Sequence, residues 1–292
     1  MNRALTLGVD AGSRQVKLAI GAGREIAFTA MIDTVQFYLA CRDGGSDSHN
    51  GGSDSRDGGS DSRNGGSDSR NGGSDSRNHG PKSGRDLDIY RLAQLAGAPR
   101  WSHVVSTGYG RNNVAVAGGR AIPEIMAHAA GAVSQTGLSH FTLVDLGGQD
   151  TKVISVRDGM VDDFVMNDKC AAGSGRYLEN IAATLGASLD TLGQCWENPV
   201  KLSNTCAIFG ESEVVGLVSD GASAQSILAG ANASVVARLA PMIRRYRPKI
   251  IVASGGVAKN MAVRKLLEIE TGVEVITPAE PQLNGAIGCV LG

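Results

Sequence analysis

Residues 141–156 read FTLVDLGGQDTKVISV, and the pattern in them occurs once more in the chain. An apolar run ends at Asp145, a turn of glycines and polar side chains follows, and Lys152 leads into a second apolar run. Short apolar runs on either side of a glycine-rich turn predict two buried strands joined as a hairpin. The backbone can approach a ligand closely at Gly147 and Gly148. Such a hairpin can cradle a phosphate group.

The same pattern appears in residues 5–20, LTLGVDAGSRQVKLAI. A predicted strand ends at Asp10, Gly12 allows close approach of the backbone, and Ser13 and Lys17 supply a hydrogen-bond donor and a positive charge. We predict that Asp10 holds Mg²⁺ through water, because this ion keeps much of its hydration shell. Two such hairpins predict two similar lobes that face each other across the phosphates of one nucleotide. Coincidental hairpins are the alternative.

Other segments contribute to this predicted site. Phosphoryl transfer depends mainly on positioning and charge neutralisation, so the second hairpin aspartate can orient an attacking or metal-bound water. Gly255 and Gly256 follow a predicted strand, 249–253, at a turn where an anion or a purine can approach. A helix predicted over 122–132 carries Glu124 and His128 on one face. That pair could bind a metal, but no third ligand lies nearby, and we expect His128 to make a surface or crevice hydrogen bond.

Two cysteines stand in similar surroundings in the run from Asn167 to Glu213. Cys170 lies in NDKCAAGSGR and Cys206 in NTCAIFGESE, and apolar residues at helical spacing follow each one. Asp168 and Thr205 are candidate N-caps of the two helices. A thiolate at a helix N-terminus meets the positive end of the helix dipole, which lowers its pKa and favours an anionic ligand.

This pair is half of what an iron–sulfur cluster needs, because such clusters usually take four thiolates. The chain has no CxxC pair, so one copy cannot easily hold a four-iron cluster. Two chains that meet at a two-fold axis could supply four ligands. The alternative is that both cysteines are small buried residues of an ordinary core.

The composition sets outer limits. The chain has 292 residues, of which 42% are hydrophobic, and its formal net charge is −1, which suits one large or two modest domains. This balance gives no electrostatic reason to expect nucleic acid or a membrane surface as a partner. No apolar run approaches the roughly 20 residues of a membrane helix, and the N-terminus lacks signal-peptide features. Five dispersed cysteines make no disulfide framework, so we expect a reducing, cytoplasmic location.

Residues 44–78 are five tandem heptads of the type GGSDSRN. They contain no apolar residue, so we expect residues 43–80 to be disordered. Calcium-binding repeats would need apolar positions that stack, and these are missing. A replicated insertion in a surface loop is the favoured interpretation, because lengthening a loop costs little.

Taken together, these motifs resemble the acetate and sugar kinase, heat-shock chaperone and actin superfamily. Within it they are most similar to the ATP-dependent activators of 2-hydroxyacyl-CoA dehydratases and to the related ATPase subunits of benzoyl-CoA reductase. The resemblance covers everything except residues 33–85. It rests on NDKCAAGSGR, Cys206 with FGESE, DLGGQD at 145–150, TGYGR at 107–111 and GGVAKN at 255–260.

The resemblance implies a two-lobed α/β fold of the actin-like, ribonuclease H-like type, each lobe a mixed sheet flanked by helices. Residues 1–136 would form the first lobe, completed by 278–292, and residues 137–277 the second. ATP and Mg²⁺ would bind in the crevice. A 4Fe–4S cluster would bridge two ATPase subunits, identical or paralogous, through Cys170 and Cys206 of each. ATP binding and hydrolysis would rotate the lobes and move the helices after these cysteines.

On this basis we assign candidate roles to individual residues. Catalytic roles are predicted for Asp10, Asp145, Gln149 and Glu124. Cofactor-binding roles are predicted for Gly12, Ser13, Lys17, Gly147, Gly148, Asp150, Gly173, Gly255 and Gly256. Cys170 and Cys206 are the predicted cluster ligands, and we expect Cys41, Cys195 and Cys289 to be free thiols. Arg14 departs from the family pattern, which has small residues at this point of the turn, and could alter phosphate contacts.

The favoured function is an ATP-hydrolysing, iron–sulfur electron-transfer subunit of a benzoyl-CoA reductase complex, because the chain departs from the compact activator pattern in its first lobe. The alternative is a homodimeric activator of a 2-hydroxyacyl-CoA dehydratase. Either would work with catalytic reductase or dehydratase subunits and a reduced ferredoxin-type donor. A small-molecule kinase of the same fold gives no reason for the two cysteines. A redox-silent regulatory ATP-binding protein would contain neither iron nor sulfide.

Overall fold

The computed structural model describes residues 4–42, 98–111, 119–167, 173–202 and 210–292. Several sequence predictions concern residues outside these ranges. They are the cluster ligands Cys170 and Cys206, the candidate caps Asp168 and Thr205, and the heptads at 44–78.

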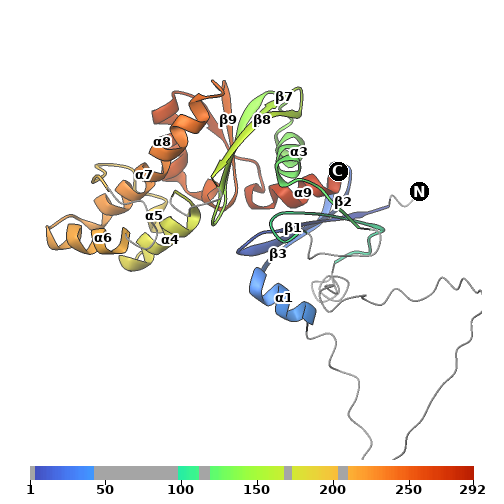
Figure 1. Cartoon of the computed structure of the whole chain (residues 1–292), viewed down its shortest axis with the longest axis horizontal. Helices are drawn as coiled ribbons and strands as arrows, with labels where there is room; N and C mark the ends of the chain where they lie inside the picture. Colours follow the sequence, from blue (N-terminus) through green and yellow to red (C-terminus); the bar gives the residue numbers. More distant parts are fainter. Residues whose placement is uncertain (1–3, 43–97, 112–118, 168–172, 203–209) are drawn as a thin grey trace, which may run out of the picture.

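The first lobe is built on a five-stranded mixed sheet. Its strands are β1 (Thr6–Ala11), β2 (Gln15–Ala22), β3 (Glu25–Asp33), β4 (His103–Thr107) and β5 (Arg120–Ala121), in the order β3-β2-β1-β4-β5. The strands β1, β2 and β3 form an antiparallel meander, whereas β4 and β5 continue the sheet in parallel. One helix, α1 (Thr34–Arg42), follows β3 and lies below the sheet in Figure 1.

The second lobe repeats this topology. Its strands are β6 (Phe141–Leu146), β7 (Thr151–Arg157), β8 (Met160–Asn167), β9 (Ile250–Ser254) and β10 (Glu274–Ile276), in the order β10-β9-β6-β7-β8. The register is repeated as well, because Asp145 pairs with Lys152 as Asp10 pairs with Lys17. The two mixed sheets with their helices confirm the fold class that the family resemblance implied.

Burial explains which strands the sequence revealed. All residues of β6, and all but the first of β1, are buried on both faces, so these strands appear as continuous apolar runs. In β3 and β8, exposed and partly buried residues alternate along the strand. Each of these two strands lies at the edge of its sheet. The acidic pair Asp162 and Asp163 interrupts the apolar pattern of β8, and neither edge strand was predicted from the sequence.

Helices α3 (Glu124–Thr136) and α9 (Asn284–Leu291) lie between the two sheets (Figure 1). The helix α3 follows the first sheet but packs against β6, β7 and β8, whereas α9 follows β10 and packs against β1, β2 and β4. The two helices also contact each other closely. Gly131 of α3 lies against the Asn284 backbone, and Gly288 of α9 lies against the Ala127 backbone. Each of these two helices therefore covers the sheet that it does not directly follow in the chain.

The other α-helices in the described part of the chain belong to the second lobe. They are α4 (Gly175–Thr184), α5 (Leu189–Leu192), α6 (Gly210–Ser219), α7 (Ala224–Arg244) and α8 (Met261–Thr271). The helices α4, α5 and α6 gather at the end of the molecule away from the first sheet (Figure 1). Tyr177, Leu178 and Ile181 of α4 are buried in the second-lobe core, as their helical spacing predicted.

Two helix starts differ from the sequence predictions. The N-cap of α4 is Ser174, not Asp168, so the helix begins several residues after Cys170. The helix α3 begins at Glu124, and Pro123 occupies its N-cap position instead of its first turn.

One described helix departs from the expectation that no segment has the length and composition of a membrane span. The helix α7 contains 21 residues and is apolar enough to cross a membrane by these two criteria. Most of it is buried inside the second lobe, where Ile227, Val235, Leu239 and Ile243 belong to the main core cluster. Its apolar character is that of a core helix.

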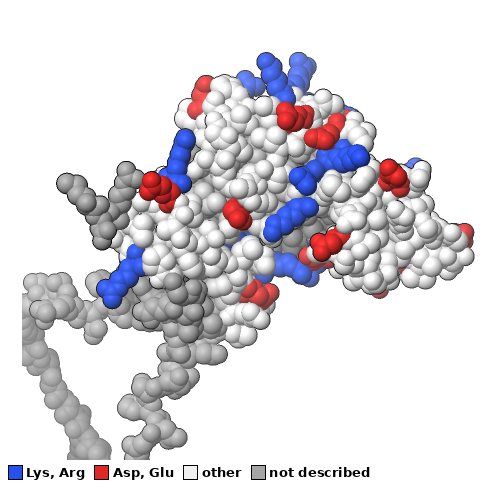
Figure 2. Space-filling view, turned by 180° about the vertical axis from the view of Figure 1, so that it is seen from behind, with Lys and Arg blue, Asp and Glu red and all other residues white. Residues whose placement is uncertain are grey.

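Figure 2 shows acidic and basic side chains interspersed over the back face of the molecule.

The close contact of α3 with α9 predicts a stability effect. A Cβ on Gly131 would clash with the Asn284 backbone, so Gly131→Ala must push the two helices apart. We expect a loss of about 1–3 kcal/mol in the free energy of unfolding, measured by chemical denaturation. Gly216→Ala in the exposed part of α6 is the control, since a Cβ there meets nothing within 4 Å. The control should be neutral or gain up to about 1 kcal/mol, and equal effects of both variants would contradict the packing.

Candidate functional site

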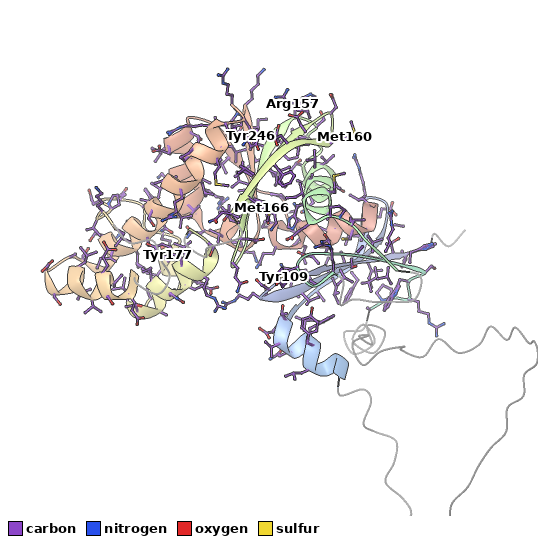
Figure 3. The ribbon with its side chains drawn as sticks, in the orientation of Figure 1. Tyr109, Arg157, Met160, Met166, Tyr177 and Tyr246 are labelled. Carbon is purple, nitrogen blue, oxygen red and sulfur yellow. The ribbon has the colours of Figure 1, made fainter. Side chains whose placement is uncertain are left out.

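The two hairpin turns border one cavity of about 1030 Å³ between the lobes. Tyr109, which follows β4, and Met166 on β8 line it from the first and second lobes (Figure 3). Its lining includes twelve of the residues that the sequence predicted: Asp10, Gly12, Ser13, Lys17, Glu124, Asp145, Gly147, Gly148, Gln149, Asp150, Gly255 and Gly256. A cavity of this size can bury a ligand as large as a nucleotide.

One predicted binding residue lies elsewhere. Gly173 is not part of the cavity lining, and a Cβ at this position would approach the Arg238 side chain of α7 to 3.0 Å. Its φ of 80° is a left-handed conformation that favours glycine. Gly173 therefore shapes the entry into α4, and the prediction of a cofactor contact receives no support from its position.

Asp10 stands at the cavity end of β1 and is almost fully buried. Its contact with a cation is to Lys17, whose Nζ donates to Asp10 Oδ2 over 3.4 Å. Gly108, directly after β4, packs on the same carboxylate with a φ of 87°, and a Cβ there would lie 2.7 Å from Asp10 Oδ1. Glycine at this position therefore keeps room for the carboxylate.

Asp145 occupies the equivalent place in the second lobe. Ser254 Oγ donates to its Oδ1 over 2.7 Å, and Lys152 Nζ lies 3.7 Å from its Oδ2. Burial opposes ionisation, but the neighbouring charges of His128 and Lys152 and the Ser254 hydrogen bond outweigh it. The pKa of Asp145 is therefore well below its ordinary value, and the group is a carboxylate at neutral pH.

Lys152 is the centre of a buried ionic cluster. Its Nζ lies 2.7 Å from Asp150 Oδ2 and 2.9 Å from Glu124 Oε1, in addition to its contact with Asp145. Burial alone would lower the pKa of this ammonium group, but the three carboxylates raise it above its ordinary value. The hairpin pattern contained Lys152, yet the sequence suggested no role for it, because Glu124 comes from a distant helix.

His128 lies between the two aspartates. Its Nδ1 is 3.3 Å from Asp145 Oδ1 but has no aligned hydrogen-bond partner among the described residues, and its Nε2 is 3.7 Å from Glu124 Oε1. Burial works against protonation, yet the negative charges of Asp145 and Asp10 raise the imidazole pKa above its ordinary value. His128 is therefore a crevice residue that faces carboxylates.

The fold supplies a third ligand for the pair that the sequence identified on α3. One potential ligand atom from each of Asp10, Glu124 and His128 lies within 4.8 Å of the others. This group was not predicted from the sequence, because Asp10 comes from the other end of the first lobe. Carboxylate oxygens suit Mg²⁺, and an imidazole suits other divalent metals.

The second phosphate turn is fixed to the start of α4. The backbone N–H of Gly175 donates to the Gly147 carbonyl over 3.0 Å, and that of Arg176 donates to the Gly148 carbonyl over 2.9 Å. Ser174 Oγ donates to the Gly148 carbonyl over 2.9 Å. The first N–H groups of α4 are thus satisfied by the turn, and a displacement of the turn would carry the helix with it.

Apolar side chains line another part of the cavity, and the sequence analysis did not predict them. Gly255 has a φ of 84°, and a Cβ there would clash with the Leu146 carbonyl, so this strand-to-helix turn needs glycine. Beside it, the lining includes apolar side chains from α4, α5, the short helix η3 (Gly256–Lys259) and α8, namely Leu178, Leu189, Leu192, Val257 and Met261. A flat ring system can pack against these side chains.

Comparisons with known proteins agree with this architecture. A solved structure, the activator of the 2-hydroxyisocaproyl-CoA dehydratase from Clostridium difficile with bound ADPNP, superposes with a TM-score of 0.73. It shares 30% sequence identity with this chain, and the match covers 98% of this chain and 93% of the activator. Two mixed sheets of equal topology around one cavity define a two-lobed, actin-like ATPase.

Sequence comparison names the family. The model of the BadF/BadG/BcrA/BcrD ATPase family matches residues 98–292, so the chain belongs to this family. The (R)-2-hydroxyglutaryl-CoA dehydratase activating ATPase of Acidaminococcus fermentans is 41% identical over 191 residues, 64% of this chain and 73% of that protein. One of the subunits of benzoyl-CoA reductase from Thauera aromatica is 33% identical over 175 residues, 56% of this chain and 62% of that protein.

The ionic cluster predicts the effect of removing its cation. Lys152→Met leaves Glu124, Asp145 and Asp150 without the ammonium group that lies between them. Breaking a buried pair in this way costs about 3–5 kcal/mol, which chemical denaturation at neutral pH would measure. Lys249→Met, at an exposed position before β9, is the control and should change stability by less than about 0.5 kcal/mol. If the Lys152 variant is as stable as the control, Lys152 does not have a central role in the ionic cluster.

Proposed function

We propose that the chain is an ATP-dependent activator of a 2-hydroxyacyl-CoA dehydratase, which passes a low-potential electron to that enzyme. The observation that carries this proposal is the match to a solved dehydratase activator over nearly the whole length of both chains. The site supports it, because both hairpin turns and the glycine turn after β9 border one cavity.

The sequence alone favoured a benzoyl-CoA reductase subunit, and the comparisons support that interpretation less well. Its basis was a departure from the activator pattern in the first lobe. The described first lobe has the same strand order as the second, and the match to the activator structure extends over it. The dehydratase activating ATPase is also more similar in sequence than the reductase subunit. The departure in the first lobe therefore gives little support to the reductase interpretation.

The residues of the cavity fit a magnesium nucleotide. Glycines in both hairpin turns leave room for phosphates, and the apolar wall beside Gly255 suits a purine. In this proposal Asp10 holds Mg²⁺ through water, and Lys17 lies close to the same phosphates. Asp145, a carboxylate at neutral pH, orients the attacking water. Gln149 and Glu124 are further candidates for this catalytic role.

We assign the cluster to Cys170 and Cys206, outside the described residues, and to the same residues of a second, identical chain. The described helices α4 and α6 each begin a few residues after one of these cysteines. A 4Fe–4S cluster held there would supply the transferable electron. The partners proposed with it are the dehydratase and a reduced ferredoxin-type donor. Cys195 and Cys289 are free thiols, which suits a reducing cytoplasm.

Iron analysis tests the cluster. The protein purified without oxygen should contain about four irons and four acid-labile sulfides per two chains. Cys170→Ser and Cys206→Ser should each lose the iron and keep nucleotide binding, whereas Cys195→Ser is the control that should keep both. Full iron content in either ligand variant would refute the assignment. Activation of a 2-hydroxyacyl-CoA dehydratase by the purified chain, without further subunits, would separate an activator from a reductase subunit.

ATP hydrolysis tests the first phosphate turn. Asp10→Asn should slow ATP turnover by at least about tenfold, because residues that hold a metal through water typically contribute this much. Iron content should not change. Asp158→Asn, in the exposed turn between β7 and β8, is the matched control and should hydrolyse ATP at the wild-type rate. Unchanged turnover in the Asp10 variant would remove this residue from the reaction.

A further inference from the structure

Arg14 connects the two phosphate turns in this structure. It belongs to the turn between β1 and β2 and lines the cavity. Its stem lies over the second turn, since a Cβ built on Gly148 would be 3.8 Å from both Cβ and Cδ of Arg14. Its guanidinium group forms an ion pair with Glu179 of α4, which also lines the cavity. One side chain thus spans from the first lobe to a helix of the second.

The other cations near the phosphate turns are already held by protein groups. Lys17 donates to Asp10, and Lys152 lies within ion-pair distance of three carboxylates. Arg111 donates to the Gly108 carbonyl over 3.1 Å. Acidic residues also line the cavity, among them Asp10, Glu124, Asp145, Asp150, Glu179 and Asp190. Lys259, the remaining lysine of the lining, belongs to η3 and not to a phosphate turn. Between the two phosphate turns, a polyphosphate therefore needs a cation that can change partner.

Arg14 meets this requirement. Half of its side chain is exposed, and an ion pair in that setting is weak because water screens it and both side chains lose freedom. A phosphate group offers more negative charge than one carboxylate and can accept two parallel hydrogen bonds from a guanidinium fork. The long, unbranched arginine stem allows such a change without movement of the backbone.

We propose that Arg14 senses the terminal phosphate of the bound nucleotide: it pairs with Glu179 in the nucleotide-free protein and with the γ-phosphate when ATP is bound. Glu179, and with it α4, is then released from the first lobe, while the start of α4 stays bonded to the second phosphate turn. This inference rests on the proposed function, in which α4 follows the cluster ligand Cys170. Loss of the γ-phosphate would restore the bridge.

Calorimetric titration of the full-length protein with ADPNP and with ADP, in the presence of Mg²⁺, tests the proposal. Arg14→Ala should weaken ADPNP binding by about tenfold or more, the usual effect of losing a hydrogen bond to a charged group. The affinity for ADP should change by less than about twofold, because ADP has no γ-phosphate. Glu179→Gln frees Arg14 and should leave ADPNP binding unchanged or tighter. Arg24→Ala, exposed in the turn between β2 and β3, is the control and should match the wild type.

The outcomes separate this inference from the proposed function. Equal weakening of ADP and ADPNP in Arg14→Ala would overturn the γ-phosphate contact while leaving the nucleotide site intact. Tighter binding of both nucleotides would mean that Arg14 only closes the nucleotide-free cavity. Weaker ADPNP binding in Glu179→Gln would mean that the pair stays together in the bound state. Failure of the wild type to bind either nucleotide would overturn the proposed nucleotide site, and the role of Arg14 with it.

Discussion

The cavity depends on the ion pairs that the buried ammonium group of Lys152 makes with carboxylates. This group joins the second hairpin to α3, because Glu124 and Asp150 come from different elements and meet at one Nζ atom. A buried charge is tolerated only when opposite charges compensate for its lost hydration. Here the compensation also fixes the rotation of α3 and therefore directs His128 towards the two aspartates. Packing of α3 against α9 then sets the position of the first lobe.

The duplicated hairpins are alike in register and unlike in environment. Each pairs an aspartate with the lysine on the facing strand. In the first lobe, Lys17 is 21% exposed and its contact with Asp10 is long, whereas Lys152 is almost fully enclosed. Lys152 also has a further partner that Lys17 lacks, since Glu124 of α3 lies 2.9 Å from its Nζ. One sequence pattern therefore yields an aspartate with a partly exposed lysine in the first lobe and a buried lysine held by three carboxylates in the second.

Much of the fold could be predicted from local pattern, and the errors have identifiable causes. The inner strands were found because burial on both faces leaves continuous apolar runs, while the edge strands β3 and β8 were missed because only one face of each is partly buried. The cap of α4 was misassigned because Asp168 and Ser174 are both good caps by residue type, and α4 begins at Gly175, directly after Ser174. The quoted motifs could not decide between activator and reductase because they are common to both, and the comparisons fit the activator better.

The sequence by itself determined the two hairpins, their aspartates and glycines, and membership in a class of nucleotide-dependent proteins, because these depend on apolar runs and turns within a few residues. Only the tertiary structure decided which side chains meet. The group of Asp10, Glu124 and His128 forms across two elements, and the Arg14–Glu179 bridge joins residues from two lobes. Such contacts depend on how α3, α4 and α9 pack against the sheets. Local sequence does not encode these distances, because packing between remote segments sets them.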